Sequence, residues 1–487
     1  MSQAPPLQDA ERNALLDQLA RLSSDADAMS DDLRTFLPLH AYTQAIHPRT
    51  VLVRGERGAG KSALFKFLRA LKYESIPVRS VFRDLPEGEI RWVEGFSEKA
   101  HGNPSPPELD QLAGSATDED LRTFWIAHLS GCLSRETRFA SALPEPFGTL
   151  WAESPTSPAR WLDAAKGALS PIIRWLDDVD AKATVAGETV AVTYDHLDKL
   201  GQYDAGIREK YVSTLLATWL TFSNRYSNLR AKVFLREDLY ARAKRTPDAS
   251  KLEARSVQLR WSREDLYRVF LRHLSTSDDL RALLGSWAQP IPFSRDSELG
   301  WLPPEALPEE GPVSQQTLCA EIVGLVMGAG TKKGYTHRWI PNHIQDAKGA
   351  IVPRSIINLF AFAAAGARDR GPKATGRRLL TPQELYAGLE NTSFHRVEEL
   401  KEEHYVVDRL EGLKGLTVMT ERKTIVARLS EAIGKNRDGF GDDGERALEE
   451  LVQLGVLRIR DDGRIDVPDL DRDGYGIKRK GGVARPR

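Results

Sequence analysis

The chain has 487 residues and carries 68 lysines and arginines against 69 aspartates and glutamates, a formal net charge of −1 at pH 7. This length suffices for about three domains and a large buried core, and the balanced charge excludes both a basic nucleic-acid coat and a disordered acidic tail. With 41% apolar residues and only two cysteines, the chain is not a disulfide-stapled scaffold.

Composition also bears on location and on metals. The longest run of small apolar residues, 359–365, is far shorter than the roughly 18 residues that span a bilayer. The first thirty residues are polar and acidic, unlike a signal peptide. His337 and His343 have no third ligand at a recognisable spacing. We therefore expect a cytoplasmic protein without a membrane segment or a structural metal.

Hydrophobic periodicity predicts alternating helices and strands along the first half of the chain. Leucines at helical spacing predict an amphipathic helix over 7–22. The β-branched run 50–54 predicts a strand, and 63–72 has the composition of a helix. Two stretches, 86–117 and 142–158, are expected to be loops. The remaining predicted elements of this half are a helix at 118–136, strands at 190–194, 231–235 and 256–261, and helices at 207–225 and 263–274.

One motif in this half carries chemistry. Residues 55–62 read Gly-Glu-Arg-Gly-Ala-Gly-Lys-Ser and match G-x-x-x-x-G-K-[ST] between a predicted strand and a predicted helix. The three glycines let backbone N–H groups approach a polyphosphate. Lys61 supplies positive charge to the β- and γ-phosphates, and the hydroxyl of Ser62 is the expected ligand of Mg²⁺. The alternative is a glycine turn without a ligand. The predicted nucleotide-binding residues are Gly55, Gly58, Ala59, Gly60, Lys61 and Ser62.

A phosphate loop of this kind needs an acidic partner for the metal at the end of a neighbouring strand. The apolar run 190–194 ends in Asp195, which we predict to bind Mg²⁺ together with Ser62. Asp198 follows three residues later and could orient or deprotonate the attacking water. A surface acid near a helix N-terminus is the alternative for Asp198.

A second apolar strand also ends in a charged residue. Residues 231–235 lead into Arg236, on the same expected edge of the sheet. Arg236 could reach the γ-phosphate, or it could form an ordinary ion pair with Glu237 or Asp238. The sequence leaves both alternatives open.

Prolines separate the two halves of the chain. Six of them fall within 286–313, where we expect no regular element and place a domain boundary. Beyond it, 315–326 predicts a helix, 328–334 is rich in glycine, and 353–368 predicts a second, strong helix.

The last hundred residues contain a different pattern. Segments 423–433 and 444–454 predict amphipathic helices. Two alternating runs, 456–460 and 464–467, are joined by an Asp-Gly turn and predict a β-hairpin. Helices followed by such a hairpin suggest a winged-helix unit. The final residues, 476–487, are basic and are expected to form a flexible tail.

Together these features resemble the bacterial P-loop ATPases of the AAA+/STAND group, and within it the origin-recognition-like and KAP-like ATPases. The shared features are the phosphate loop, Asp195-x-x-Asp198, the strand ending in Phe-Leu-Arg236, the Val-x-Leu-x-Trp strand at 257–261, the Pro353-Arg354 helix and the terminal winged helix, over roughly residues 30–475. The resemblance implies an α/β fold, a P-loop NTPase core with a parallel sheet, followed by a helical lid and a C-terminal winged-helix-like domain. The expected division is 1–45 as an N-terminal helical segment, 46–285 as the ATPase core, 286–370 as the Pro-rich loop and lid, 371–475 as the winged-helix-like domain, and 476–487 as the tail.

The same resemblance implies roles for two arginines. It gives Arg236 a sensor role and Arg354, at the start of the lid helix, a second sensor role, so that Asp198, Arg236 and Arg354 are the predicted catalytic residues. AAA+ motors usually carry Asp-Glu where this chain has Asp195 followed by His196, which favours a slow STAND-type switch. The chain has no Asn-Lys-x-Asp, so ATP is favoured over GTP.

Two functions of different classes follow. The first is an ATP-binding and slowly ATP-hydrolysing regulatory switch, which by family analogy serves bacterial defence or mobile-element systems. The alternative is a DNA-binding winged-helix module in which nucleotide is a structural cofactor. For the switch we expect ATP and Mg²⁺ as ligands, and a protein partner or a homo-oligomer. DNA stays open as a partner.

Overall fold

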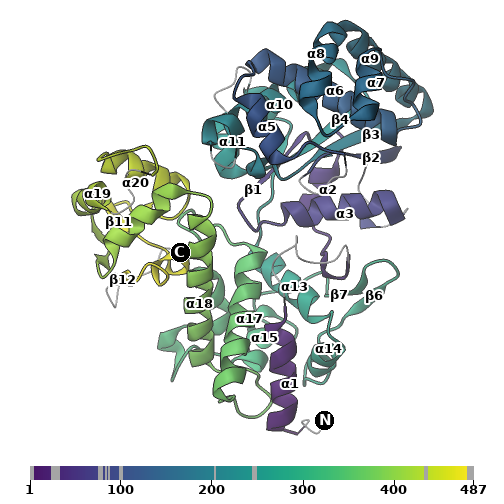
Figure 1. The fold of residues 1–487 in the computed structure, drawn as a ribbon. Helices are drawn as coiled ribbons and strands as arrows, with labels where there is room; N and C mark the ends of the chain where they lie inside the picture. Colours follow the sequence, from purple (N-terminus) through teal and green to yellow (C-terminus); the bar gives the residue numbers. More distant parts are fainter. Residues whose placement is uncertain are drawn as a thin grey trace. The chain divides into compact units, whose positions relative to one another are not determined.

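The computed structural model describes residues 5–22, 33–74, 81–82, 85, 88–97, 102–201, 204–243, 249–432 and 437–479. The chain divides into two compact units (Figure 1). One unit is Pro38–Leu259, and the other combines Met1–Leu37 with Arg260–Arg487.

The unit Pro38–Leu259 is built on a five-stranded parallel sheet with the strand order β2-β3-β4-β1-β5. Strands β3 and β4 are buried along nearly their whole length, as expected of parallel strands that helices cover on both faces. This parallel sheet and its helices confirm the α/β part of the predicted fold class. The strands are β1 (Leu52–Gly55), β2 (Glu89–Phe96), β3 (Glu188–Tyr194), β4 (Leu229–Arg236) and β5 (Ser256–Gln258).

Helices pack against both faces of this sheet. Helix α3 lies on one side, and α6, α9 and α10 lie on the other (Figure 1). Helix α6 begins at the residue predicted, because Thr117 accepts a hydrogen bond from the backbone N–H of Asp120 and completes a capping box. The helices are α2 (His40–Ile46), α3 (Lys61–Glu74), α5 (Pro106–Ala113), α6 (Asp118–Glu136), α7 (Phe147–Glu153), α8 (Pro158–Gly167), α9 (Leu169–Ala186), α10 (Ala205–Arg225), α11 (Glu237–Ala243) and α12 (Ala249–Glu253).

Two stretches expected to be loops contain regular elements, so those predictions are wrong. The stretch 86–117 holds strand β2 and helix α5. Strand β2 carries Glu89, Arg91 and Glu94 and lies at the edge of the sheet, where charged side chains reach solvent and hide the alternating pattern. Helices α5 and α7 are short, and the prolines that suggested loops stand at their N-terminal ends, where proline is compatible with a helix.

The second unit is mainly helical around its own core. Helix α1 packs against α17, and α17 packs against α18. The stretch 286–313 contains an antiparallel hairpin of β6 (Ser294–Asp296) and β7 (Gly300–Leu302), which corrects the expectation of no regular element. All six prolines lie outside these two strands, so the ladder keeps its N–H donors. The helices are α1 (Asp9–Ala20), α13 (Arg263–Leu274), α14 (Asp278–Gly285), α15 (Gln315–Ile322), α16 (Thr336–His343), α17 (Pro353–Arg370) and α18 (Pro382–Lys401).

The same unit ends in three helices, a three-stranded sheet and a two-stranded sheet. The predicted hairpin is confirmed: β10 pairs antiparallel with β11 across a turn in which Gly463 has φ 76°. A third strand joins them in the order β10-β11-β9. Of the predicted tail, Lys478 and Arg479 pair with β8, and 480–487 lie outside the described residues. The elements are β8 (Thr417–Val418), β9 (Thr420–Glu421), α19 (Arg422–Glu431), α20 (Gly444–Gln453), β10 (Arg458–Ile459), β11 (Arg464–Asp466), α21 (Asp469–Arg472) and β12 (Lys478–Arg479), preceded by a 3₁₀ helix at Tyr405–Leu413.

Among the described residues, no helix has the length and apolar character needed to cross a membrane.

Candidate phosphate-binding site

The predicted phosphate loop connects strand β1 to helix α3. Strand β1 ends at Gly55 and α3 begins at Lys61. Gly58 and Gly60 have φ angles of 78° and 89°, which side chains other than glycine rarely adopt. A Cβ atom on Gly55 would come within 3.0 Å of the Cβ of Ala59, so the loop closes tightly over its first residue. The N-terminus of a 14-residue helix therefore faces a compact glycine turn, as an anion-binding site requires.

The strand order explains why this loop lies at a crevice. The chain passes from β1 to β2 at the far edge of the sheet, then returns through β3 and β4 and crosses to β5. Because crossovers between parallel strands are right-handed, the connection from β1 to β2 and the later connections, which run the opposite way along the sheet, carry their helices on opposite faces. Neighbouring strands β1 and β4 thus send their chains to opposite sides, which opens a ligand crevice at their carboxyl ends. In the register, Gly55 lies beside Arg236 at the end of β4.

Lys61 is held inside the loop. Its Nζ atom donates hydrogen bonds to the carbonyl oxygens of Gly55 at 2.8 Å and of Glu56 at 2.9 Å. The residue is only 9% exposed. Burial and, to a smaller extent, the positive charge of Arg236 lower the pKa of Lys61 to about 8, against the opposing effect of nearby carboxylates. The lysine is therefore a desolvated cation that an anionic ligand would stabilise.

Asp195 directly follows strand β3 and is 5% exposed. Burial raises the pKa of this carboxyl, although His196 opposes the shift. Its Oδ2 atom is buried and receives no hydrogen bond from any residue that the structure describes. A buried carboxylate oxygen without a donor fits a divalent cation, and Ser62, the second residue of α3, offers the hydroxyl ligand. When bound, Mg²⁺ neutralises phosphate charge at such a site.

The backbone turns sharply after Asp195. His196 has φ 57°, a left-handed conformation that is uncommon outside glycine and tends to occur at functional sites. This turn leads into a short 3₁₀ helix, Leu197–Lys199, which carries Asp198. The Oδ2 atom of Asp198 lies 3.9 Å from Nη1 of Arg236. The fold thus brings Asp198 to the same edge of the sheet as the phosphate loop, with 30% of its side chain exposed.

Arg236 is nearly buried and lies between two carboxylates. Its Nε and Nη2 atoms donate hydrogen bonds to the two carboxylate oxygens of Asp238 at 3.0 and 3.2 Å. The ion pair with Asp238 is thus the one observed, whereas Glu237 binds Arg54 at 3.2 Å. Because Arg236 also lowers the pKa of Lys61, its charge acts at the phosphate loop. Arg236 therefore forms an ion pair with Asp238 and also lies beside the phosphate loop, so the two alternatives for this residue are compatible.

Sequence reasoning missed Arg208. This residue of α10 donates hydrogen bonds to the carbonyl oxygens of Leu200 at 2.9 Å and of Gly201 at 3.0 Å. Burial lowers its pKa, whereas the negative charge of Asp198 opposes that shift. Arg208 thereby anchors the segment that carries Asp195 and Asp198. No sequence signal could reveal this, because the contacts join a helix to a preceding irregular segment.

Arg354 belongs to the other unit. It stands in the first turn of α17, and its Nη1 atom donates to Oε1 of Glu399 on α18 at 2.9 Å. About a fifth of its side chain is exposed. Its role toward a nucleotide stays a prediction.

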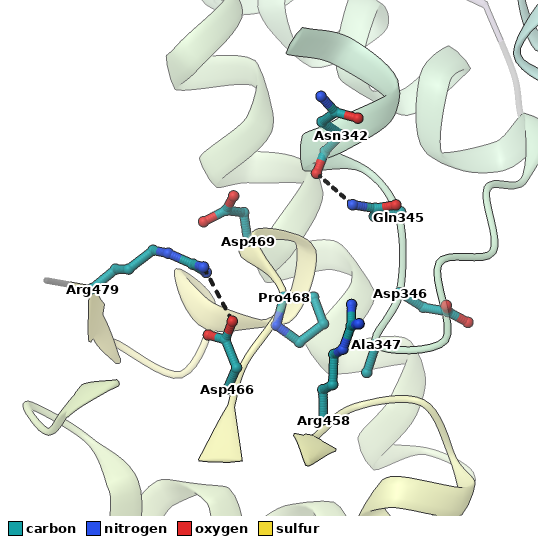
Figure 2. A pocket seen from close by; sticks show the side chains of 9 residues that line it. All are labelled: Asn342, Gln345, Asp346, Ala347, Arg458, Asp466, Pro468, Asp469 and Arg479. Atoms are coloured by element: carbon teal, nitrogen blue, oxygen red, sulfur yellow. Dashed lines mark hydrogen bonds and ion pairs between the residues drawn. The ribbon is translucent and has the colours of Figure 1, made fainter. Parts of the chain in front are cut away.

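That unit also contains a pocket lined by nine residues, among them Asp346, Asp466 and Asp469 (Figure 2). Two of its three carboxylates have cationic partners: Asp466 accepts hydrogen bonds from Arg479 at 3.1 Å and Arg460 at 3.4 Å, and Asp469 accepts one from Arg472 at 3.1 Å. The pocket lacks a glycine turn and a lysine. Within the described residues, no group of three or more His, Cys, Asp or Glu side chains could hold a metal ion. The phosphate loop is the stronger candidate site.

No family model matches the chain, and no curated protein matches its sequence. Among solved structures, the chain is similar to the ORC2 protein of Aeropyrum pernix in ADPNP–ADP complexes, at 12% identity over 97% of this chain and 95% of that one, with a TM-score of 0.39. It is similar to a Walker-type ATPase of Pyrococcus abyssi at 15% identity, over 94% and 99% of the two chains, with a TM-score of 0.40. It is similar to the ORC1 protein of A. pernix in complex with DNA at 13% identity, over 97% of this chain and 93% of that one, with a TM-score of 0.33. Since these TM-scores lie below 0.5, the fold and the site rest on the chain's own residues.

Proposed function

We propose that the chain binds ATP with Mg²⁺ at the carboxyl edge of its parallel sheet and hydrolyses it slowly. One observation carries the proposal. A desolvated lysine is held at the mouth of a glycine turn, at the same sheet edge as a buried aspartate whose Oδ2 atom receives no hydrogen bond from the described residues. Phosphates would satisfy the lysine, and a divalent cation would satisfy the carboxylate.

Each residue then has a definite role. The N–H groups of the loop and the N-terminus of α3 bind the phosphate oxygens, and Lys61 contacts the β- and γ-phosphates. Ser62 and Asp195 hold the cation. Asp198 accepts a hydrogen bond from the attacking water, and Arg236 stabilises the charge of the γ-phosphate.

Slow hydrolysis fits the residue that follows the metal ligand. His196 stands there in place of a second carboxylate, so Asp198, with its partly exposed side chain, would have to orient the water. An ATPase that turns over slowly serves as a switch, in which the nucleotide state sets a conformation. In this proposal, of AAA+/STAND type, Arg354 links the γ-phosphate to the helical unit and a protein partner or a second copy reads the outcome.

The DNA-binding alternative is less well supported by charge. In a helix-turn-helix arrangement the second helix enters the major groove, and here that helix would be α20. Helix α20 carries Glu445, Glu449 and Glu450 and is capped by Asp443. This charge would repel phosphates. We therefore assign the winged-helix-like part to a protein contact.

Competition between nucleotides tests the proposal. A fluorescent ATP analogue would be bound to the full chain and displaced by ATP, ADP or GTP, with Mg²⁺ or with EDTA. We expect ATP to displace it at least tenfold more strongly than GTP, and to displace it more weakly in EDTA than in Mg²⁺. Phosphate release should depend on Mg²⁺ at a rate below about 1 s⁻¹, at or under the low end of typical enzymes. Equal displacement with EDTA would contradict the assigned metal ligands.

A further inference from the structure

Asp238 lies two residues after Arg236, where strand β4 leads into helix α11. Arg236 is the last residue of β4, and Asp238 is the second residue of α11. Because β4 pairs with β1, this junction lies beside Gly55, where the phosphate loop begins. The pairing of β4 with β1 therefore brings Asp238, like Arg236, to the edge of the sheet where the phosphate loop begins.

The contact between the two side chains has a defined geometry. Two parallel hydrogen bonds join Nε to Oδ1 at 3.0 Å and Nη2 to Oδ2 at 3.2 Å. Both side chains are only 12% exposed. A two-point contact between a guanidinium and a carboxylate fixes the plane of the guanidinium as well as its position. A flexible arginine is thereby oriented before any ligand binds.

A second carboxylate competes for the same arginine. Oδ2 of Asp198 lies 3.9 Å from Nη1 of Arg236, within ion-pair distance but longer than the contacts to Asp238. Without the charge of Asp238, the guanidinium would be drawn to Asp198. That shift would engage the carboxylate assigned to the water and would turn the guanidinium away from the γ-phosphate.

We infer that Asp238 is a positioning residue, which orients the guanidinium of Arg236 toward the γ-phosphate and keeps it off Asp198. The inference rests on the proposed ATP site. It accounts for a charged, nearly buried aspartate that holds the guanidinium of Arg236 by two parallel hydrogen bonds. It also predicts an effect confined to the γ-phosphate, because ADP offers nothing for Arg236 to bind.

Asp238→Asn keeps the size of the side chain and removes its charge. We expect ATP hydrolysis to slow about tenfold or more and ATP affinity to fall severalfold, while ADP affinity stays unchanged. In an Arg236→Gln background, the same change should have no further effect, since the residue acts through the arginine. Asp238→Glu, which retains the charge, should recover part of the rate.

Glu237→Gln is the matched control, because it removes a carboxylate from the same helical turn that binds Arg54 instead. It should leave the rate and the ATP-to-ADP affinity ratio unchanged. Thermal unfolding of each variant establishes that it is folded. Equal losses of ATP and ADP affinity, additive effects with Arg236→Gln, or faster hydrolysis in Asp238→Asn would each overturn the inference. If the unaltered chain binds no ATP, the proposed function fails; if it hydrolyses ATP and Asp238→Asn does so equally, only this inference fails.

Discussion

The lowered pKa of Lys61 makes ATP binding dependent on pH in a range where few other groups titrate. Burial, together with the charge of Arg236, lowers the pKa of the ligand-free lysine to about 8. Bound phosphates favour the charged ammonium, so the pKa in the complex must be higher. Above pH 8, binding ATP therefore requires uptake of a proton.

The size of the pH effect on ATP affinity follows from the fractions of charged and neutral Lys61. With a pKa of about 8, roughly nine tenths of the lysine is charged at pH 7 and about one tenth at pH 9. Affinity for ATP should therefore fall about tenfold between these pH values, or about 1.4 kcal/mol. At pH 9 binding should take up about 0.9 proton per ATP.

Calorimetry over pH 7 to 9.5, in buffers that differ in ionisation enthalpy, measures both the affinity and the proton uptake. Arg236→Gln is an informative variant, since the charge of Arg236 lowers the pKa of Lys61; in this variant the midpoint should move to higher pH. Lys66→Ala, a change on the same helix α3, should retain the original profile. Constant affinity from pH 7 to 9 without proton uptake would refute the assignment of Lys61 as the buried phosphate ligand.

Three further substitutions separate the roles at the site. Asp195→Asn should weaken ATP binding about tenfold or more in Mg²⁺ and leave binding in EDTA unchanged, as measured by calorimetry; equal weakening in both would remove it from the metal site. Asp198→Asn should leave the ATP dissociation constant within about twofold and lower the rate of phosphate release more than tenfold. An unaltered rate would make Asp198 a surface acid. Arg354→Ala should reduce the difference in radius of gyration between the ATP and ADP states in small-angle scattering; an undiminished difference would leave Arg354 only its ion pair with Glu399.

The features predicted well from the sequence are those that depend on local pattern. The phosphate loop needs only its own residues and the flanking strand and helix, and both flanking elements are present. Helix α6 was predicted at its observed bounds because its capping residues and apolar face lie within one segment. The run before Asp195 is apolar because β3 is a central strand, buried on both faces.

The features that sequence reasoning missed depend on contacts that appear only in the folded chain. The charged sequence of strand β2 predicts a loop, and only its pairing with β3 identifies it as a strand. Arg208 donates to the carbonyl oxygens of Leu200 and Gly201, eight and seven residues earlier, and no sequence pattern marks such a side-chain contact. For Asp238, the sequence offered only a local ion pair, and the sheet register is what brings that pair to the phosphate loop.

Direct titration of the full chain with ATP and Mg²⁺ tests the central claim, using the unaltered chain, Lys61→Ala and Lys66→Ala. Lys61 lies at the first residue of α3 and donates only to loop carbonyl oxygens, so its removal should leave the protein folded. We predict one ATP per chain with micromolar affinity for the unaltered chain and for Lys66→Ala, and no measurable binding for a folded Lys61→Ala. Equal ATP affinity in Lys61→Ala would show that the glycine turn is not the nucleotide site.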